Sequence, residues 1–382
     1  MRKWLLLGLA ATVLAAPADP AGGQLKIQPR TSPPAETSPA APAAPAAAPA
    51  AAEKKAAADA RREAADLPVQ FRKKKGDDAA RKALVDRAIE LGPAAAGGLL
   101  AAVQAELAPL QARYRQAFYK EAQAGVRAKL KDSRPQDVEN LRQKILATVK
   151  RTDLTKEMVV QDADPALKEL REKLLLEPEG VLSGAEALRK MRDEAAALAQ
   201  HAQRLADALP APPAGKPGEA PAPPRFEAAI RAEEEIAVLA VIAPDDRARK
   251  TLADNLPLEP KIQPEEARGL RFLNQVRLLA GLQPCQLDTR LCEAARDHSK
   301  DMVEKNFFAH ESPVAGKRLP WDRAKNFGTS AAAENIANGQ ESGADTIMQW
   351  WHSPGHLKNM MDSHGRAGLG KHQKTWTLML GG

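Results

Sequence analysis

Residues 307–313 read Phe-Phe-Ala-His-Glu-Ser-Pro, residues 333–337 read Ala-Glu-Asn-Ile-Ala, and residues 350–356 read Trp-Trp-His-Ser-Pro-Gly-His. These stretches place large aromatic side chains close to histidine and glutamate. Aromatic side chains bury the most area per residue, so they mark where a hydrophobic core is built most readily. The three stretches therefore predict a compact C-terminal domain that carries polar residues beside its core.

Aromatic residues are concentrated around these stretches. A chain of 382 residues is long enough for two or three domains. Of its 14 Phe, Trp and Tyr residues, eight lie within residues 265–382, namely Phe272, Phe307, Phe308, Trp321, Phe327, Trp350, Trp351 and Trp376. This uneven distribution favours one well-packed domain, which we place at residues 264–382.

Two helices are expected ahead of the motifs. Residues 268–282 and 291–305 carry apolar side chains at helical spacing, and Gly281-Leu282-Gln283-Pro284 reads as the turn between them. The chain closes with Trp-Thr-Leu-Met-Leu-Gly at residues 376–381. In this order and spacing, the motifs resemble the bacterial branch of the CAP superfamily, named for cysteine-rich secretory proteins, antigen 5 and plant pathogenesis-related proteins. The resemblance covers roughly 118 of the 382 residues.

The resemblance implies an α+β fold, in which a three-layer α-β-α sandwich holds a cleft with two histidines and two acidic residues. Matched motif by motif, His310 and His356 take the places of the two family histidines. Glu334 takes the place of the acid in the family's Gly-Glu-Asn motif, whose glycine is Ala333 here. The second family acid has no clear counterpart, because a histidine and a serine follow the tryptophan pair.

His310, Glu334 and His356 suggest two kinds of chemistry. Two imidazoles and a carboxylate suit a divalent metal such as zinc, with an open position for water. The same groups could instead hydrogen-bond one another. His352 should not share a helix face with His356, because Ser353-Pro354 reads as a cap followed by a first-turn proline. The sequence contains no His-Glu-x-x-His motif of a metalloprotease.

Other polar residues of this domain are expected to be structural. His298 and Ser299 should tie their helix to its neighbours, and Asn335 and Asn359 should bond to backbone. Glu311 is either a substitute for the missing acid or an exposed carboxylate beside His310. The aromatic residues expected in the core or the cleft wall are Trp350, Trp351, Trp321 and Phe308.

The two cysteines, Cys285 and Cys292, lie seven positions apart. An even number of closely spaced cysteines in an exported protein suggests a disulfide. The alternative is a pair of buried thiols. Only the distance and orientation of the two side chains can decide between a disulfide and free thiols.

The N-terminus predicts export. Arg2 and Lys3 precede an apolar run over residues 4–16 that is too short to span a bilayer stably, and Ala16-Pro17-Ala18 permits cleavage. We expect a signal peptide at residues 1–18 and a secreted, periplasmic or cell-surface protein. An uncleaved membrane anchor is the alternative, because the proline makes the cleavage site imperfect.

Composition divides the remaining chain. Residues 19–76 are expected to be a disordered Ala/Pro-rich linker, since residues 31–52 hold almost nothing except alanine and proline. Residues 210–225 repeat Pro-Ala-Pro-Pro and form a second linker. Between them, residues 77–209 read as a helical, coiled-coil-like region. Residues 226–263 read as a helical connector with a break near residues 244–246.

Several signals in residues 77–209 mark helix ends. An aspartate at 77–78 can cap a helix that Gly92 ends and Pro93 restarts. Asp164-Pro165 reads as a cap and first-turn proline, and residues 183–186 read as a capping box. The apolar residues that follow at spacings of three and four form a seam for another helix, within the chain or in a second copy: Leu188, Met191, Ala195, Leu198, Ala202, Leu205 and Leu209. His201, beside this seam, is expected at the surface.

The formal net charge is +7, but its distribution does not indicate nucleic-acid binding. Residues 265–382 hold 15 Lys and Arg against 13 Asp and Glu, so they carry +2 and the first 264 residues carry +5. No basic stripe interleaved with aromatic residues occurs. We interpret the charge as solvated helix faces, with adhesion to an anionic surface as the alternative.

Three functions remain open. The first is a non-enzymatic exported module that binds an envelope lipid, glycan or peptide. The second is a metal-dependent hydrolase in which Glu334 acts as general base while His310 and His356 hold the ion. The third is an envelope spacer or adhesin that acts, or self-associates, through its helical stem.

Overall fold

The computed structural model describes residues 48–210 and 226–382. The expected signal peptide at residues 1–18 and nearly all of the expected linker at residues 210–225 lie outside this part of the chain. Within it, no helix combines the length and the apolar character needed to cross a membrane. Residues Lys54–Gly382 form one compact unit.

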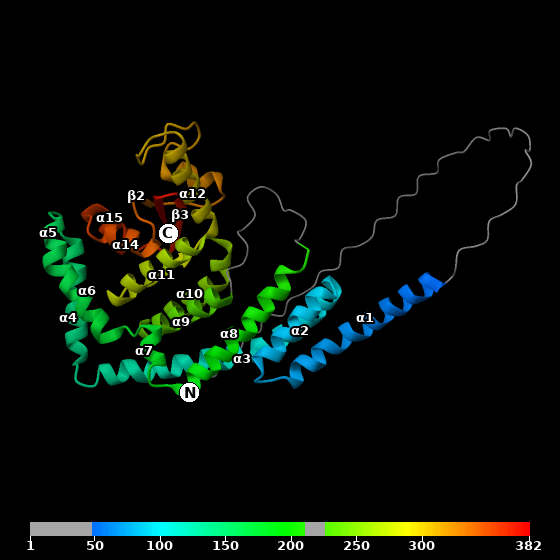
Figure 1. Cartoon of the computed structure of the whole chain (residues 1–382). Coiled ribbons are helices and arrows are strands. Elements are labelled where there is room, and N and C mark those ends of the chain that lie inside the picture. Colours follow the sequence, from blue (N-terminus) through cyan, green and yellow to red (C-terminus); the bar gives the residue numbers. More distant parts are fainter. Residues whose placement is uncertain (1–47, 211–225) are drawn as a thin grey trace, which may run out of the picture. The chain divides into compact units, whose positions relative to one another are not determined.

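Helices make up the first part of the described chain (Figure 1). They are α1 (Ala48–Lys73), α2 (Asp78–Glu90), α3 (Pro93–Lys129), α4 (Pro135–Lys150), α5 (Lys156–Met158), the π-helical turn η1 (Val159–Ala163), α6 (Asp164–Leu174), α7 (Pro178–Leu182) and α8 (Glu186–Asp207). Helix α1 occupies the described part of the segment that we expected to be linker, whose residues 19–47 lie outside the described chain. Alanine has the highest helix propensity, and Leu67 and Phe71 are buried here, so packing stabilises a helix in place of an extended spacer.

The predicted cap of α2, the predicted boundary between α2 and α3, and the apolar seam of α8 are confirmed. Asp77 caps α2 by accepting a hydrogen bond from the backbone N–H of Ala80. Gly92 has a φ of 100°, which favours glycine, and α3 starts at Pro93. Most of the apolar seam of α8 is buried, Met191 and Leu209 are partly buried, and the helix packs against α3 of the same chain.

Two predicted caps are wrong, because the side chains expected to cap the helices form hydrogen bonds with other groups. The Ser183 hydroxyl donates to the carbonyl of Gly180, and α8 begins without a side-chain cap. Asp164 is the first residue of α6, and its carboxylate accepts hydrogen bonds from Trp351 and His352 in the C-terminal part of the chain. Local pattern alone cannot reveal such distant partners.

His201 is buried, contrary to our expectation of a surface residue. Its Nε2 lies 2.8 Å from Asp78 Oδ1, and its ring meets Phe71 edge-on at 5.8 Å between centroids. The histidine therefore joins α8 to α1 and α2.

The connector, residues 226–263, is helical. It consists of α9 (Phe226–Ile242), α10 (Asp246–Asn255) and the 3₁₀-helix η2 (Leu256–Lys261). After the break between the first two helices, Asp245 caps α10. Its carboxylate accepts a hydrogen bond from the N–H of Ala248.

The C-terminal part has α+β architecture, as expected. Its elements are α11 (Pro264–Leu279), β1 (Gln286–Leu287), α12 (Thr289–Glu304), α13 (Pro320–Asn326), β2 (Ala333–Asn338), α14 (Gly343–Trp351), α15 (Pro354–Met361), β3 (Arg366–His372) and β4 (Thr375–Gly381). The sheet order is β1-β3-β4-β2; β1 is parallel to β3, and the other two pairings are antiparallel. Glu334 lies opposite Met379 in the β2–β4 pair.

Alternating residues of β3 explain how helices cover both faces of the sheet. A side chain at Gly368 or Gly370 would collide with the backbone of α12, so glycine allows this helix to lie directly on the sheet. Leu369 points to the opposite face, where it meets Gly269 of α11. Gly269 in turn contacts Gly343 of α14. The result is three layers, with α12 on one face and α11 with α14 on the other.

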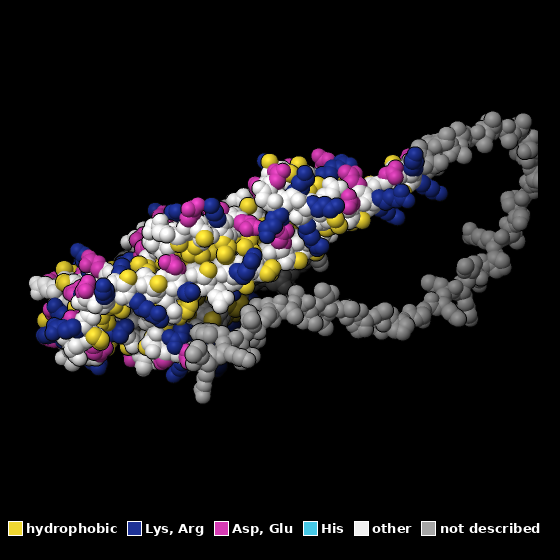
Figure 2. Space-filling view, turned by 90° about the horizontal axis from the view of Figure 1, so that it is seen from below, with side chains coloured by type: hydrophobic (Ala, Val, Ile, Leu, Met, Phe, Trp, Pro, Cys, Tyr) yellow, Lys and Arg dark blue, Asp and Glu magenta, His cyan; other side chains and the backbone are white. Residues whose placement is uncertain are grey.

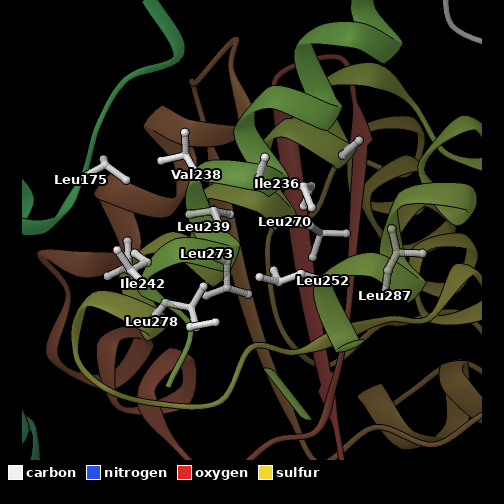
Figure 3. Packing of buried hydrophobic residues seen from close by; sticks show 14 of the residues in the cluster. Leu175, Ile236, Val238, Leu239, Ile242, Leu252, Leu270, Leu273, Leu278 and Leu287 are labelled. Carbon is white, nitrogen blue, oxygen red and sulfur yellow. The ribbon is translucent and has the colours of Figure 1, made fainter. Parts of the chain in front are cut away.

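The connector and the C-terminal domain share one hydrophobic core (Figure 3). Buried apolar side chains from α9, α10, α11 and β1 meet there, including Ile236, Ile242, Leu252, Leu270 and Leu287. Polar contacts add to this joint, since Arg271 Nε donates to Glu235 Oε2 over 2.7 Å. The connector helices therefore pack directly on the C-terminal domain.

Both outer strands of the sheet have side-chain partners on their open edges. The amide of Asn255, at the end of α10, bonds to the carbonyl of Cys285 and the N–H of Leu287, beside β1. On β2, the carbonyl of Ile336 accepts from Trp350 Nε1 over 3.0 Å, and that of Glu334 accepts from Asn359 over 3.3 Å. Side chains therefore occupy positions that another strand would need for pairing.

Cys285 and Cys292 are free, buried thiols, so the alternative to the predicted disulfide is correct. Cys285 Sγ donates to the carbonyl of His364 over 3.4 Å, while Cys292 sits on α12 beneath Gly368. Burial raises the pKa of both thiols. The two residues pack into different surroundings as protonated side chains.

Charged side chains of both signs are interspersed on the face seen in Figure 2. Exposed ion pairs of the described chain include Arg87 with Glu63 at 2.6 Å and Lys190 with Glu186 at 2.7 Å. This mixture is the pattern of solvated helix faces, and such pairs contribute little to stability.

Candidate functional site

Glu334 is the centre of the candidate site. It lies on β2, and its side chain is only 1 % exposed. Oε2 accepts a hydrogen bond from Arg323 Nη2 over 2.5 Å, and Oε1 lies 2.9 Å from His310 Nδ1. Both carboxylate oxygens therefore have a partner.

Arg323, on α13, fixes the loop before that helix to β2. Its guanidinium is completely buried and donates to the carbonyls of Lys317 and Arg318 through Nη1. Nη2 donates to the carbonyl of His310 over 3.1 Å as well as to Glu334. One arginine thus holds the backbone of His310 and the carboxylate that meets its ring.

Sequence reasoning missed Arg323. Many of the 56 Lys and Arg residues have acidic neighbours on helices, and nothing in the local pattern sets this arginine apart. Arg323 reaches Glu334 only because the chain folds back from α13 to the start of β2. A buried carboxylate does require a cationic or hydrogen-bonding partner, and that requirement is the signal that could have prompted a search.

His298, on α12, lies behind Glu334. Its imidazole is fully buried, and Nε2 donates to the carbonyl of Ala309 over 3.1 Å. The same nitrogen is 3.9 Å from Glu334 Oε1. Burial is the main cause that lowers the pKa of His298 to about 4, so the ring is neutral near pH 7. The expected structural role fits these contacts, as it does for Ser299, which bonds to Gly370 and Thr377 across the sheet.

His310 presents the exposed end of the site. Its side chain is half exposed, and its Nδ1 faces the carboxylate of Glu334. A carboxylate accepts hydrogen bonds, so Nδ1 of the neutral ring carries the proton. Nε2 is then left as a hydrogen-bond acceptor.

His356 approaches from α15. Its ring packs edge-on against Trp350 at 6.3 Å between centroids, and its Nδ1 is buried without a hydrogen-bond partner among the described residues. Burial is the main cause that lowers the pKa of His356, and the proximity of the His310 imidazole adds to it. The carbonyl of His356 accepts from Asn335, and Asn359 bonds to both the backbone of Glu334 and the side chain of Asn335. Asn335 and Asn359 thus tie α15 to β2.

The structure therefore brings two of the three predicted residues into direct contact. His310 touches Glu334, while His356 is linked to Glu334 through the two asparagines. His352 instead bonds to Asp164 over 3.0 Å, away from His356, as the sequence suggested. Glu311 pairs with Arg318 at the surface and is not the missing acid.

These side chains do not fit the divalent metal that we considered. Both oxygens of Glu334 are engaged, one of them by a guanidinium that would repel a cation at the same point. Across residues 48–210 and 226–382, no group of three or more His, Cys, Asp and Glu side chains is arranged to hold a metal ion.

Four aromatic residues were expected in the core or the cleft wall, and they divide into two pairs. Trp350 and Trp351 are buried, and both indole N–H groups have acceptors. Phe308 and Trp321 are more than half exposed, so Trp321 is not a core residue. Phe308 lines an open groove that also includes the end of β2.

Comparisons with known proteins concern the domain that holds this site. Residues 270–369 match the model of the cysteine-rich secretory protein family, CAP. Over 117 residues the chain is 38% identical to the uncharacterized protein YkwD of Bacillus subtilis (strain 168), an alignment covering 29% of this chain and 45% of YkwD. Over 113 residues it is 32% identical to the uncharacterized membrane protein YlbC of the same strain, covering 29% of this chain and 33% of YlbC.

A solved structure of an extracellular protein containing a SCP domain, from Bacillus anthracis str. Ames, is also similar to the chain. It aligns with 32% of this chain and 42% of its own chain, at 25% sequence identity and a TM-score of 0.30. The matched regions span less than half the length of each of these relatives.

Proposed function

Because residues 270–369 form a CAP domain, we propose that the protein is an exported binding module, whose surface at His310 and His356 binds a polar group of an envelope lipid, glycan or peptide. The observation that carries this proposal is the state of Glu334. Its carboxylate is buried, paired with Arg323 and bonded to His310, so it positions the histidine. It is not free to act as a general base on a substrate.

The groups around His310 also favour binding over covalent chemistry. A carboxylate–histidine pair can activate a hydroxyl or thiol nucleophile that lies within hydrogen-bond reach of the imidazole. Within the described residues the ring of His310 hydrogen-bonds to Glu334, and no serine, threonine or cysteine side chain bonds to this ring. The outward Nε2 of His310 is suited to accept a hydrogen bond from a ligand hydroxyl or amide.

A metal-dependent hydrolase receives less support. That function needs His310 and His356 to hold one ion and Glu334 to act as general base, and the carboxylate of Glu334 is already paired with Arg323. Export is supported by the basic residues and apolar run at the N-terminus, which form a signal-peptide pattern.

Binding of the purified full chain to phospholipid vesicles and to soluble peptidoglycan fragments tests the proposal. We expect saturable binding to one of these probes, with affinity reduced roughly tenfold or more when His310→Ala and His356→Ala remove two polar contacts. Glu311→Ala is the matched control, because this exposed carboxylate beside His310 pairs only with Arg318 at the surface. Absence of saturation with every probe would contradict the proposal.

The metal content of the purified protein distinguishes the metal-dependent hydrolase from the binding module. The hydrolase requires stoichiometric metal in the wild type that is lost in the double variant. The binding module predicts the same negligible content in both.

A further inference from the structure

An open groove lies where α12 ends, beside the turn between β3 and β4. Its volume is about 690 Å³, and its lining includes Val303, Phe307 and Phe308. The lining also includes Asn338, at the end of β2, and Gln373, in the turn. Phe308 is only two residues from His310, while Asn338 is at the other end of the strand that carries Glu334. The groove is therefore a neighbour of the His310 site and not a part of it.

Phe308 gives the groove an exposed aromatic surface. Its side chain is 54 % exposed, although Phe307 beside it packs against His298 at 5.9 Å between ring centroids. The adjoining Phe307 is thus anchored in the domain while Phe308 remains available to a ligand. An exposed ring of this kind can stack against the apolar C–H face of a sugar.

Amide side chains give the groove a polar surface. Asn306, Asn338 and Gln373 are exposed and line it together. Within the described residues, the side chains of Asn306 and Gln373 have no hydrogen-bond partner, and each can both donate and accept. Both residues have a φ of 54°, so their backbones occupy the left-handed region in tight turns at the edge of the groove.

The rim carries no excess charge. Lys374 and Glu341 both line the groove, and they pair with each other at 2.7 Å. A strongly anionic or cationic ligand would have to break this pair or leave one member unmatched. A neutral ligand with many hydroxyl groups fits the rim better.

Two other occupants fit less well. An acyl chain requires an enclosed, mainly apolar channel, whereas this groove is open and has amide side chains in its lining. An extended peptide that added a strand to β2 would need free backbone groups. However, Trp350 and Asn359 already take the carbonyls of Ile336 and Glu334 on the outer edge.

We infer that this groove binds a neutral oligosaccharide, which stacks one sugar on Phe308 and places its hydroxyl or acetamido groups against Asn306, Asn338 and Gln373. The inference rests on the proposed function as an extracytoplasmic binding module and names the ligand class that this surface takes.

Calorimetric titration of the full chain tests the inference with two probes. They are the β-1,4-linked tetramer of N-acetylglucosamine and cellotetraose, which has the same linkage without acetamido groups. We expect saturable binding of at least one tetramer and a roughly tenfold or larger loss of affinity in Phe308→Ala. Trp321→Ala is the matched control, because Trp321 is 53 % exposed and lies outside the groove. It should leave the affinity unchanged. Asn338→Ala should weaken binding as Phe308→Ala does, and circular dichroism would verify that each variant is folded.

Three results would overturn the inference. The first is that neither tetramer binds the wild type. The second is that Phe308→Ala and Trp321→Ala have equal effects on the affinity for the tetramers. The third is that Phe308→Ala abolishes binding to phospholipid vesicles while sugar binding never saturates. If a tetramer still binds Phe308→Ala but not the variant with His310→Ala and His356→Ala, the groove inference fails while the proposed function stands. If no probe of any class saturates, both fail.

Discussion

Replacing Glu334 by glutamine tests the buried ion pair at the centre of the site. The Glu334 side chain is 1 % exposed and its partner Arg323 is fully buried, so Glu334→Gln leaves a buried guanidinium without a counter-charge. Breaking such a pair costs about 3 to 5 kcal/mol of unfolding free energy. Arg323 retains three carbonyl acceptors, and the glutamine oxygen can still accept one hydrogen bond. We therefore expect the lower end, about 3 kcal/mol.

Equilibrium unfolding in urea, followed by circular dichroism, measures this loss. The midpoint should fall with little change in slope, because the same surface is exposed on unfolding. Glu311→Gln removes an exposed carboxylate that also pairs with an arginine, and it should cost no more than about 0.5 kcal/mol.

A double-mutant cycle with Arg323→Met identifies the cause of the loss. The two substitutions together should cost about 2 kcal/mol less than the sum of the single variants, because each single change leaves an unmatched buried charge. Additivity within about 0.5 kcal/mol would refute the reasoning, as would a cost below about 1 kcal/mol for Glu334→Gln alone.

Three further outcomes are expected. Asp164→Ala removes the acceptor of a buried indole N–H and should lower stability by about 2 kcal/mol in urea unfolding. Asp162→Ala is the control, because it removes only an exposed partner of a 3.7 Å ion pair and should have almost no effect. Equal losses in the two variants would contradict this account. Because the pKa of His298 is lowered, the unfolded chain binds a proton at this residue between about pH 6.5 and 4, and the folded chain does not. The free energy of unfolding should therefore fall by up to about 3 kcal/mol as the pH falls through that window. His298→Gln should remove that part of the pH dependence, and an unchanged slope would argue against a buried neutral ring. Cys285 and Cys292 should react with a thiol reagent only after unfolding, and fast modification of either native thiol would contradict their burial.

Helix signals that act within a few residues could be predicted. Asp77 caps α2, and Gly92 with Pro93 separates α2 from α3, because a cap, a left-handed glycine and a first-turn proline depend on neighbouring backbone alone. Asp164 shows the limit of such reasoning. Its sequence context suits a cap, but an indole 187 positions away competes for the same carboxylate.

Candidate site residues could be predicted only where their motif is distinctive. His310 and Glu334 stand in recognisable motifs and do meet in the structure. Arg323 joins them through carbonyls of a loop, and His298 lies behind the carboxylate because α12 packs on the sheet. Both relations depend on tertiary packing, which no short spacing encodes.

The close packing of the helices on the CAP domain also escaped prediction. Proline-rich composition at residues 210–225 suggested separate parts, yet Asn255 bonds beside β1 and the apolar side chains of α9 enter the core of the domain. The apolar pattern of α9 predicts that the helix is buried but does not identify the surface that buries it.

The most direct test of the account is the imidazole ¹⁵N spectrum of His310, measured at pH 7 before and after addition of soluble peptidoglycan fragments. The chain has seven histidines, so single substitutions can assign each ring. We predict that His310 carries its proton on Nδ1, facing Glu334, and that its Nε2 signal shifts as the ligand saturates the site. A ring protonated on Nε2, or an Nε2 signal that does not change while the fragments bind, would contradict the claim that Glu334 positions His310 to receive a ligand.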